Sequence, residues 1–140
     1  KQVIDARVAF IIKVILREAA RRGTAKKVSS LKRSDLAGKT GTTNEAESTW
    51  FTGFNDHLVT SVWVGFDQPR SLGNREFGSS TALPIWIEYM KGNLQNLPEN
   101  KTIPPEGLVS IKVDKTSGLR SENSSSNSLF EYFLEEFGPE

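Results

Sequence analysis

Hydrophobic residues near the start of the chain recur every three or four positions, and this spacing returns later in the sequence. The first apolar set shares one face of a helix: Val8, Ile11, Ile12, Ile15 and Ala19. We therefore predict a helix over residues 5–22, with Gly23 placed to end it. Residues 80–92 form a second predicted helix, in which Pro84 suits the first turn and Gly92 the end.

Between the two predicted helices the pattern changes to β-type runs. Residues 36–43 are predicted to be extended, and residues 48–54 ("STWFTGF") and 58–66 ("LVTSVWVGF") are predicted to form a hairpin. The second run has apolar residues on both of its faces, which predicts a strand inside a sheet, covered on each side. Gly53 and Gly65 are predicted to mark places where another backbone or a large side chain lies close.

The composition of the chain changes after Asn93. A Pro-rich connector leads to a short predicted strand over residues 108–114 and then to a serine-rich segment. The last stretch has aromatic side chains at helical spacing: Phe130, Phe133 and Phe137. We expect it to be a helix that docks on another surface. The chain is thus expected to hold two parts, residues 1–93 and residues 94–140.

Overall composition narrows the possible classes of protein. The chain has 140 residues, 36% hydrophobic and 25% charged, which suits one ordinary globular domain or a piece of a larger one. Its longest apolar run, Val8 to Ile12, is far shorter than the roughly 20 residues that span a bilayer. Net charge is +1, and the basic cluster from Arg17 to Arg33 lacks the interleaved aromatics of a nucleic-acid surface. The absence of cysteine excludes disulfides, thiolate catalysis and cysteine-based zinc sites.

The glycine-flanked pair Lys39-Thr40 is the main chemical feature of the sequence. Gly38-Lys39-Thr40 matches the end of a phosphate-binding loop, but Arg33 stands where that loop needs its first glycine. The residues after Thr40 also look extended rather than helical, so we do not expect an NTPase site. Two interpretations remain from the residues alone: part of an acyl-transfer site, or a glycine-rich strand without a site.

The surroundings of Lys39 resemble the Lys-Thr-Gly strand of penicillin-binding protein transpeptidase domains. Residues 36–67, "LAGKTGTTNEAESTWFTGFNDHLVTSVWVGFD", are similar to that strand and the hairpin that follows it, above all in the class A bifunctional enzymes. Residues 8–28, 78–90 and 129–140 resemble the preceding helix, a later helix and the C-terminal tail of this family. The resemblance implies an α+β fold of the penicillin-binding, β-lactamase-like serine transferase type. In that fold a central antiparallel sheet has helices on both faces, and this chain would hold its C-terminal portion.

The same resemblance implies a function and a set of site residues. The family cross-links the peptide stems of peptidoglycan by serine acyl transfer, as D,D-transpeptidases, and binds β-lactams, at the periplasmic face of the bacterial inner membrane. Lys39 would supply positive potential for a substrate carboxylate, and Thr40 and Thr42 would offer hydroxyls to it. Gly41 would let the substrate lie against the strand. The backbone N–H of Thr42 would be one of two oxyanion-hole donors. No cofactor and no metal is implied.

The family also needs a Ser-x-x-Lys and a Ser-x-Asn motif, and we do not expect either in this chain. With 15 serines and 10 lysines, about one chance Ser-x-x-Lys match is expected, and Ser29 to Lys32 supplies it. Ser29 also leads directly into the Lys39 strand, which leaves no room for a catalytic helix. The two Ser-x-Asn matches, at residues 121–123 and 125–127, follow the strand instead of preceding it.

The expected partners are therefore an upstream segment of the same domain that carries both motifs, the stem peptide and β-lactams. Nucleic acid and direct membrane contact by this segment are not expected, and the membrane anchor would lie outside this chain. His57, the only histidine, is interpreted as a surface turn residue. The alternative function is a non-catalytic interaction module that docks a partner through the aromatic tail.

Overall fold

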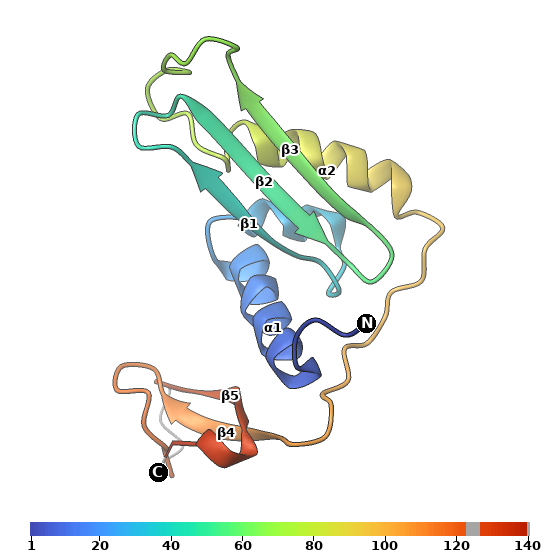
Figure 1. The fold of residues 1–140 in the computed structure, drawn as a ribbon, viewed down its shortest axis with the longest axis vertical. Coiled ribbons are helices and arrows are strands. Elements are labelled where there is room, and N and C mark those ends of the chain that lie inside the picture. Colours follow the sequence, from blue (N-terminus) through green and yellow to red (C-terminus); the bar gives the residue numbers. More distant parts are fainter. Residues whose placement is uncertain (123–126, 140) are drawn as a thin grey trace. The chain divides into compact units, whose positions relative to one another are not determined.

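The structure, a computed structural model, describes residues 1–122 and 127–139 and divides into two compact units (Figure 1). One unit is Lys13–Thr102, and the other joins Lys1–Ile12 to Ile103–Glu140. Helix α1 (Ala6–Arg22), which confirms the first predicted helix, begins in the second unit and ends in the first. The division expected between residues 93 and 94 concerns the domains of a larger protein and stays a prediction.

A three-stranded antiparallel sheet forms the centre of the Lys13–Thr102 unit (Figure 1). Its strands are β1 (Ala37–Thr42), β2 (Ser48–Phe54) and β3 (Val59–Gly65), in that spatial order. The predicted extended segment and hairpin are thus confirmed.

The prediction that the third strand lies inside a sheet is wrong for the residues that the structure describes. Strand β3 is at one edge, β2 is central, and Val59 and Trp63 are 73% and 46% exposed. Apolar residues on both faces of a strand indicate that both faces can be buried. They do not show whether a neighbouring strand pairs with each of its two edges.

Helix α2 (Ala82–Asn93) packs across one face of the sheet and closes the core of this unit. Trp86 is fully buried there, with its ring centroid 4.9 Å from that of Phe51 in an edge-on arrangement. A Cβ atom at Gly53 would lie 2.5 Å from Cζ2 of Trp86, so the predicted close approach at this glycine is confirmed. The predicted helix end at Gly92 is wrong by one residue, because α2 continues through Asn93.

The 3-10 helix η1 (Lys26–Leu31) packs against α2 from the segment that precedes β1. Ser29 lies inside this short helix, which ends at Leu31, so no helix stands between Ser29 and β1, as expected. The core of the unit combines residues of α1, η1, β2 and α2 with residues next to these elements and before β1: Ala20, Ala25, Val28, Leu36, Phe51, Ala82, Leu83, Trp86, Met90 and Leu94.

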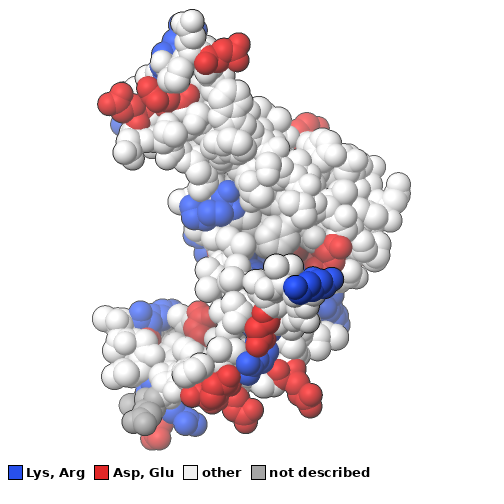
Figure 2. Space-filling view, in the orientation of Figure 1, with Lys and Arg blue, Asp and Glu red and all other residues white. Residues whose placement is uncertain are grey.

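The opposite face of the sheet carries exposed side chains and no element of the described unit covers it. Trp50 and Trp63 are cross-strand neighbours there, with ring centroids 6.4 Å apart. Beside them Thr52 and Ser61 share a hydrogen bond of 2.8 Å. Figure 2 shows that the surface over the strands is largely uncharged, with basic atoms over β1.

The other unit contains a two-stranded antiparallel sheet made of β4 (Leu108–Asp114) and β5 (Ser128–Leu134). The predicted strand over residues 108–114 is confirmed, but the predicted C-terminal helix is wrong. Most of that stretch is β5, and only Glu135–Phe137 turns, as the 3-10 helix η2. Its aromatic and aliphatic side chains suit a strand as well as a helix, and pairing with β4 over seven residue pairs decides between them. Within this unit Phe10 packs edge-on against Tyr132.

Candidate functional site

Strand β1 lies at an edge of the described sheet, so one side of its backbone is not paired with another described strand. The Thr43 N–H donates to the Ser48 carbonyl at 3.1 Å, which directs odd-numbered backbone groups toward β2. Because backbone groups alternate along an antiparallel strand, the N–H and C=O groups of Thr40 and Thr42 point away from β2. The four predicted site residues therefore stand on a strand whose outer edge can accept another extended chain.

Lys39 and Thr40 form a small hydrogen-bonded group at this edge. The exposed Lys39 Nζ donates to the Thr40 carbonyl at 2.9 Å and to Thr40 Oγ1 at 3.3 Å. Thr40 Oγ1 also lies 2.8 Å from Oγ1 of Thr24, which belongs to the turn between α1 and η1. The ammonium group is thus held beside the outward-facing backbone of β1.

Gly41 and Thr42 make contacts on opposite sides of the strand. A Cβ atom at Gly41 would lie 3.3 Å from Cβ of Trp50, so the indole side chain occupies the space beside this glycine. Thr42 is exposed, and its Oγ1 accepts a hydrogen bond of 3.1 Å from the N–H of Gly78. Thr24 and Gly78 were missed from the sequence, since each is brought to β1 from a distant loop.

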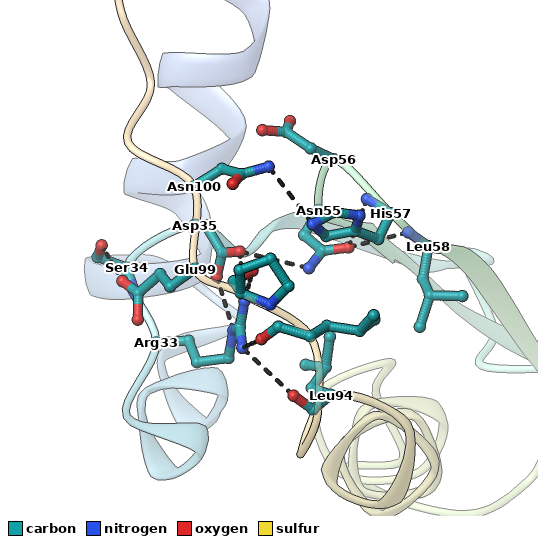
Figure 3. A network of polar contacts seen from close by, with 12 residues as sticks. Arg33, Ser34, Asp35, Asn55, Asp56, His57, Leu58, Leu94, Glu99 and Asn100 are labelled. Carbon is teal, nitrogen blue, oxygen red and sulfur yellow. Dashed lines mark hydrogen bonds and ion pairs between the residues drawn. The ribbon is translucent and has the colours of Figure 1, made fainter.

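A buried ion pair fixes the chain just before β1 (Figure 3). Arg33 binds both carboxylate oxygens of Asp35, through Nε at 2.9 Å and Nη2 at 2.7 Å. The same guanidinium donates to the carbonyls of Leu97 and Pro98, each at 2.8 Å. It thereby ties the start of β1 to the connector that follows α2. We call this set of contacts the Arg33 network.

Asn55 extends the Arg33 network into the turn between β2 and β3 (Figure 3). Its Nδ2 donates to Asp35 Oδ2 at 3.3 Å, and its Oδ1 accepts the N–H groups of His57 and Leu58 at 3.0 and 2.9 Å. His57 is exposed in this turn, as predicted, and its Nε2 lies 3.4 Å from Asn100 Nδ2. The network therefore links three segments around the beginning of β1.

Opposing effects act on the pKa of the Asp35 carboxyl. Burial raises the pKa, but the hydrogen bonds and charge of Arg33, together with the hydrogen bond from Asn55, outweigh it. The net pKa lies below the ordinary value of 3.8. A group with a lowered pKa in the folded state stabilises the fold above its unfolded pKa, and this stabilisation is lost as pH falls through the folded pKa.

We therefore expect the stability difference between the wild type and Asp35→Asn to depend on pH. The difference in free energy of unfolding should be largest above about pH 4, the ordinary pKa range of aspartate, and should shrink as Asp35 becomes protonated. Urea unfolding at pH 7 and pH 3, followed by tryptophan fluorescence, measures it. An equal difference at both pH values would contradict the depressed pKa.

The serine motifs rejected from the sequence do not form a catalytic pair in the described residues. Ser29 lies within η1, where its Oγ donates to the Lys26 carbonyl at 2.7 Å. Lys32 follows η1 in a left-handed conformation, with φ 53°. Of the two Ser-x-Asn matches, Asn123, Ser125 and Ser126 lie outside the described residues.

Neither a metal site nor a membrane span is found in the described part of the chain. No three His, Cys, Asp or Glu residues among residues 1–122 and 127–139 are placed to hold a metal ion. No described helix has the length and apolar character needed to cross a bilayer. Two surface hollows adjoin η1, and both are lined by Lys32 and Arg33 instead of Lys39.

Comparison with known proteins identifies the family of the chain. No family model matches it. Penicillin-binding protein 1A of Pseudomonas aeruginosa is 46% identical over 139 residues, which is 99% of this chain. The chain belongs to the class A penicillin-binding protein family. Its similarity to penicillin-binding protein 1A of Neisseria lactamica is 45% identity over 108 residues, or 77% of the chain.

The fold of the chain is also that of a penicillin-binding protein. The crystal structure of penicillin-binding protein 1A from Haemophilus influenzae matches 99% of the chain with a TM-score of 0.91 and 39% sequence identity. The predicted α+β class is thereby confirmed. The chain spans only 17% and 14% of the lengths of the two sequence relatives and 22% of the crystallised chain.

Proposed function

We propose that this chain forms the carboxylate-binding wall of a peptidoglycan D,D-transpeptidase, whose serine nucleophile lies in an upstream segment. One observation carries the proposal: the edge of β1 presents the Lys39 ammonium group together with the outward N–H of Thr42. The relatives named penicillin-binding protein 1A support it.

Each group on β1 has a defined task in this proposal. The substrate peptide, or a β-lactam in its place, lies along the outer edge of β1 as an added strand. Its carboxylate accepts hydrogen bonds from the hydroxyls of Thr40 and Thr42 in the positive potential of Lys39. The Thr42 N–H donates to the oxyanion that develops when the serine attacks the carbonyl, a role that typically contributes about 3–4 kcal/mol. Gly41 keeps the strand free of a side chain at this point.

The upstream segment of the same domain is the proposed protein partner. The uncharged sheet face around Trp50 and Trp63 and the outer edge of β3 are the surfaces that it would cover, because exposed apolar faces and strand edges favour association. The whole protein would act at the periplasmic face of the inner membrane, anchored through another segment. The chain itself would contact neither membrane nor nucleic acid.

Lys39→Ala tests the proposed function in the full-length protein. We expect the second-order rate constant for acylation by a fluorescent β-lactam to fall about 10- to 100-fold. The variant removes the positive charge beside the carboxylate and the hydrogen bonds from Lys39 Nζ that hold Thr40. A hydrogen bond to a charged group contributes about 1.5–3 kcal/mol, and about 1.4 kcal/mol corresponds to a factor of ten. Gel fluorescence after timed labelling gives the rate constant.

Lys101→Ala is the matched control, since Lys101 is also exposed but lies in the connector after α2. Its acylation rate should equal that of the wild type. Peptide mapping should place the adduct on a serine outside residues 1–140, and the 140-residue chain alone should form none. An adduct on Ser29, or equal rates for Lys39→Ala and Lys101→Ala, would overturn the proposal.

A further inference from the structure

The loop that precedes α2 lies directly against the backbone of β1 and β2 at the Gly41–Trp50 pair. A Cβ atom at Gly78 would lie 2.5 Å from the Trp50 carbonyl oxygen and 2.8 Å from that of Gly41. Both of these atoms belong to the paired backbone, which cannot yield as a flexible side chain can. Only glycine therefore fits at residue 78 in this arrangement, and its N–H reaches Thr42 Oγ1 at 3.1 Å.

The hydrogen bond between Gly78 and Thr42 has a fixed direction. A backbone N–H can only donate, so the Thr42 oxygen must accept, and the single hydroxyl proton must point elsewhere. The described residues offer this hydroxyl no acceptor, and Thr42 is exposed. Its proton is therefore available to a bound anion. The contact between Thr40 and Thr24 does not fix the direction of the Thr40 hydroxyl proton, because either hydroxyl can be the donor.

The position of the Gly78 amide is itself fixed by the start of α2. The Gly78 carbonyl accepts the N–H of Leu83 at 2.8 Å, and the Phe77 carbonyl accepts Thr81 Oγ1 at 2.9 Å. Thr81 Oγ1 also lies 2.5 Å from Oγ1 of the buried Thr49 on β2. The loop is thus connected to both α2 and the sheet, which holds the donor in place before a ligand arrives.

We propose that Gly78 is a positioning residue for carboxylate recognition. Its amide holds the Thr42 hydroxyl as a donor directed to the ligand carboxylate, so the loop before α2 determines specificity without touching the ligand. This inference rests on the proposed function of β1.

The test compares a β-lactam that has a free carboxylate with its methyl ester, in the full-length protein. The measured quantity is the acylation rate constant of the free carboxylate divided by that of the methyl ester. Gly78→Ala should lower this ratio about two- to tenfold, the effect of one hydrogen bond. Gly92→Ala is the matched control, because a Cβ at Gly92 meets no atom within 4 Å, and it should leave the ratio unchanged. In a Thr42→Val background, Gly78→Ala should lower the ratio no further, because the accepting oxygen is already absent.

A purely structural role of Gly78 would lower both rate constants equally and leave their ratio unchanged, and this result would overturn the inference. A further decrease of the ratio when Gly78→Ala is added to Thr42→Val would also overturn the inference. If the wild type forms no adduct, the proposed function fails and this inference fails with it. Normal wild-type labelling with an unchanged ratio in Gly78→Ala defeats this inference alone.

Hydrogen exchange tests the contact without altering Gly78, in case Gly78→Ala does not fold. Thr42→Val keeps the shape of the side chain but removes the accepting oxygen. The Gly78 amide should exchange about fivefold faster in Thr42→Val than in the wild type, as expected when one ordinary hydrogen bond is lost. Thr42→Ser, which retains the hydroxyl, should keep the wild-type exchange rate. Equal exchange in Thr42→Val and the wild type would show that the bond does not position Thr42.

Discussion

Arg33→Ala is expected to lower the free energy of unfolding by about 3–5 kcal/mol, the usual effect of removing one partner of a buried ion pair. The Asp35 side chain is only 1% exposed, and that of Arg33 is 13% exposed. Without the guanidinium, the Asp35 carboxylate would keep only weaker hydrogen bonds among the described residues: a long one of 3.3 Å from Asn55 and one from its own backbone N–H. The carbonyls of Leu97 and Pro98 would lose a donor as well. Urea unfolding of the wild type and the variant measures the difference.

Arg21→Ala is the matched control for Arg33→Ala. Arg21 also pairs with a carboxylate, Glu18, but its side chain is 53% exposed, and surface pairs contribute about 0–1 kcal/mol. Replacing Arg33 and Asp35 together by Met and Leu should recover most of the loss, because no unpaired charge remains buried. A loss in Arg33→Ala no larger than that in Arg21→Ala would show that the Arg33 network does not hold the start of β1.

Local sequence patterns predicted the elements whose structure is decided locally. The apolar spacing around Ile11 and Ile15 fixes α1, and the alternating runs on either side of Asn55 fix the hairpin of β2 and β3. The helix predicted for the aromatic tail was wrong because its apolar spacing suits both a helix and a strand. Only pairing with β4, about 20 residues earlier in the chain, selects the strand. The pattern of either segment alone does not predict long-range pairing of this kind.

The candidate site shows the same division between local and long-range information. Lys39 and Thr42 were predicted because they stand in one contiguous run with a recognisable context. Thr24 and Gly78 were not, since they reach β1 from residues that are 16 and 36 positions away in the sequence. Close approaches were predicted at Gly53 and Gly65 because these glycines lie within strand patterns. Gly78 lies in a loop, where no such pattern indicates a close approach. The residues proposed to position the site are therefore harder to predict than those proposed to contact the ligand.

Trp86→Ala is expected to lower the free energy of unfolding by about 3–5 kcal/mol, as for other fully buried aromatic residues. Trp86 is 0% exposed, packs edge-on against Phe51, and donates from Nε1 to the Thr60 carbonyl at 3.1 Å. Phe51 pairs with Thr40 across the strands, so the cavity would form directly beneath the candidate site. Tyr89→Ala on the same helix is the matched control, since Tyr89 is 49% exposed, and it should cost far less. Urea unfolding followed by circular dichroism is suitable, because it does not depend on the tryptophan that is removed.

Gly53→Ala, made with and without Trp86→Ala, tests whether the close contact between residue 53 and the Trp86 ring matters for stability. In the wild type the added Cβ would lie 2.5 Å from Cζ2 of Trp86, and overpacking of this kind costs about 1–3 kcal/mol. In the Trp86→Ala background the same methyl group would enter the space that the indole has left, so its cost should fall to that of the remaining contact, 2.7 Å from Cε1 of Phe51. Residues in direct contact are expected to show such coupling in a double-mutant cycle. Equal costs of Gly53→Ala in both backgrounds would mean that Gly53 is not required by the Trp86 ring, and that α2 does not support β1 and β2 through this contact.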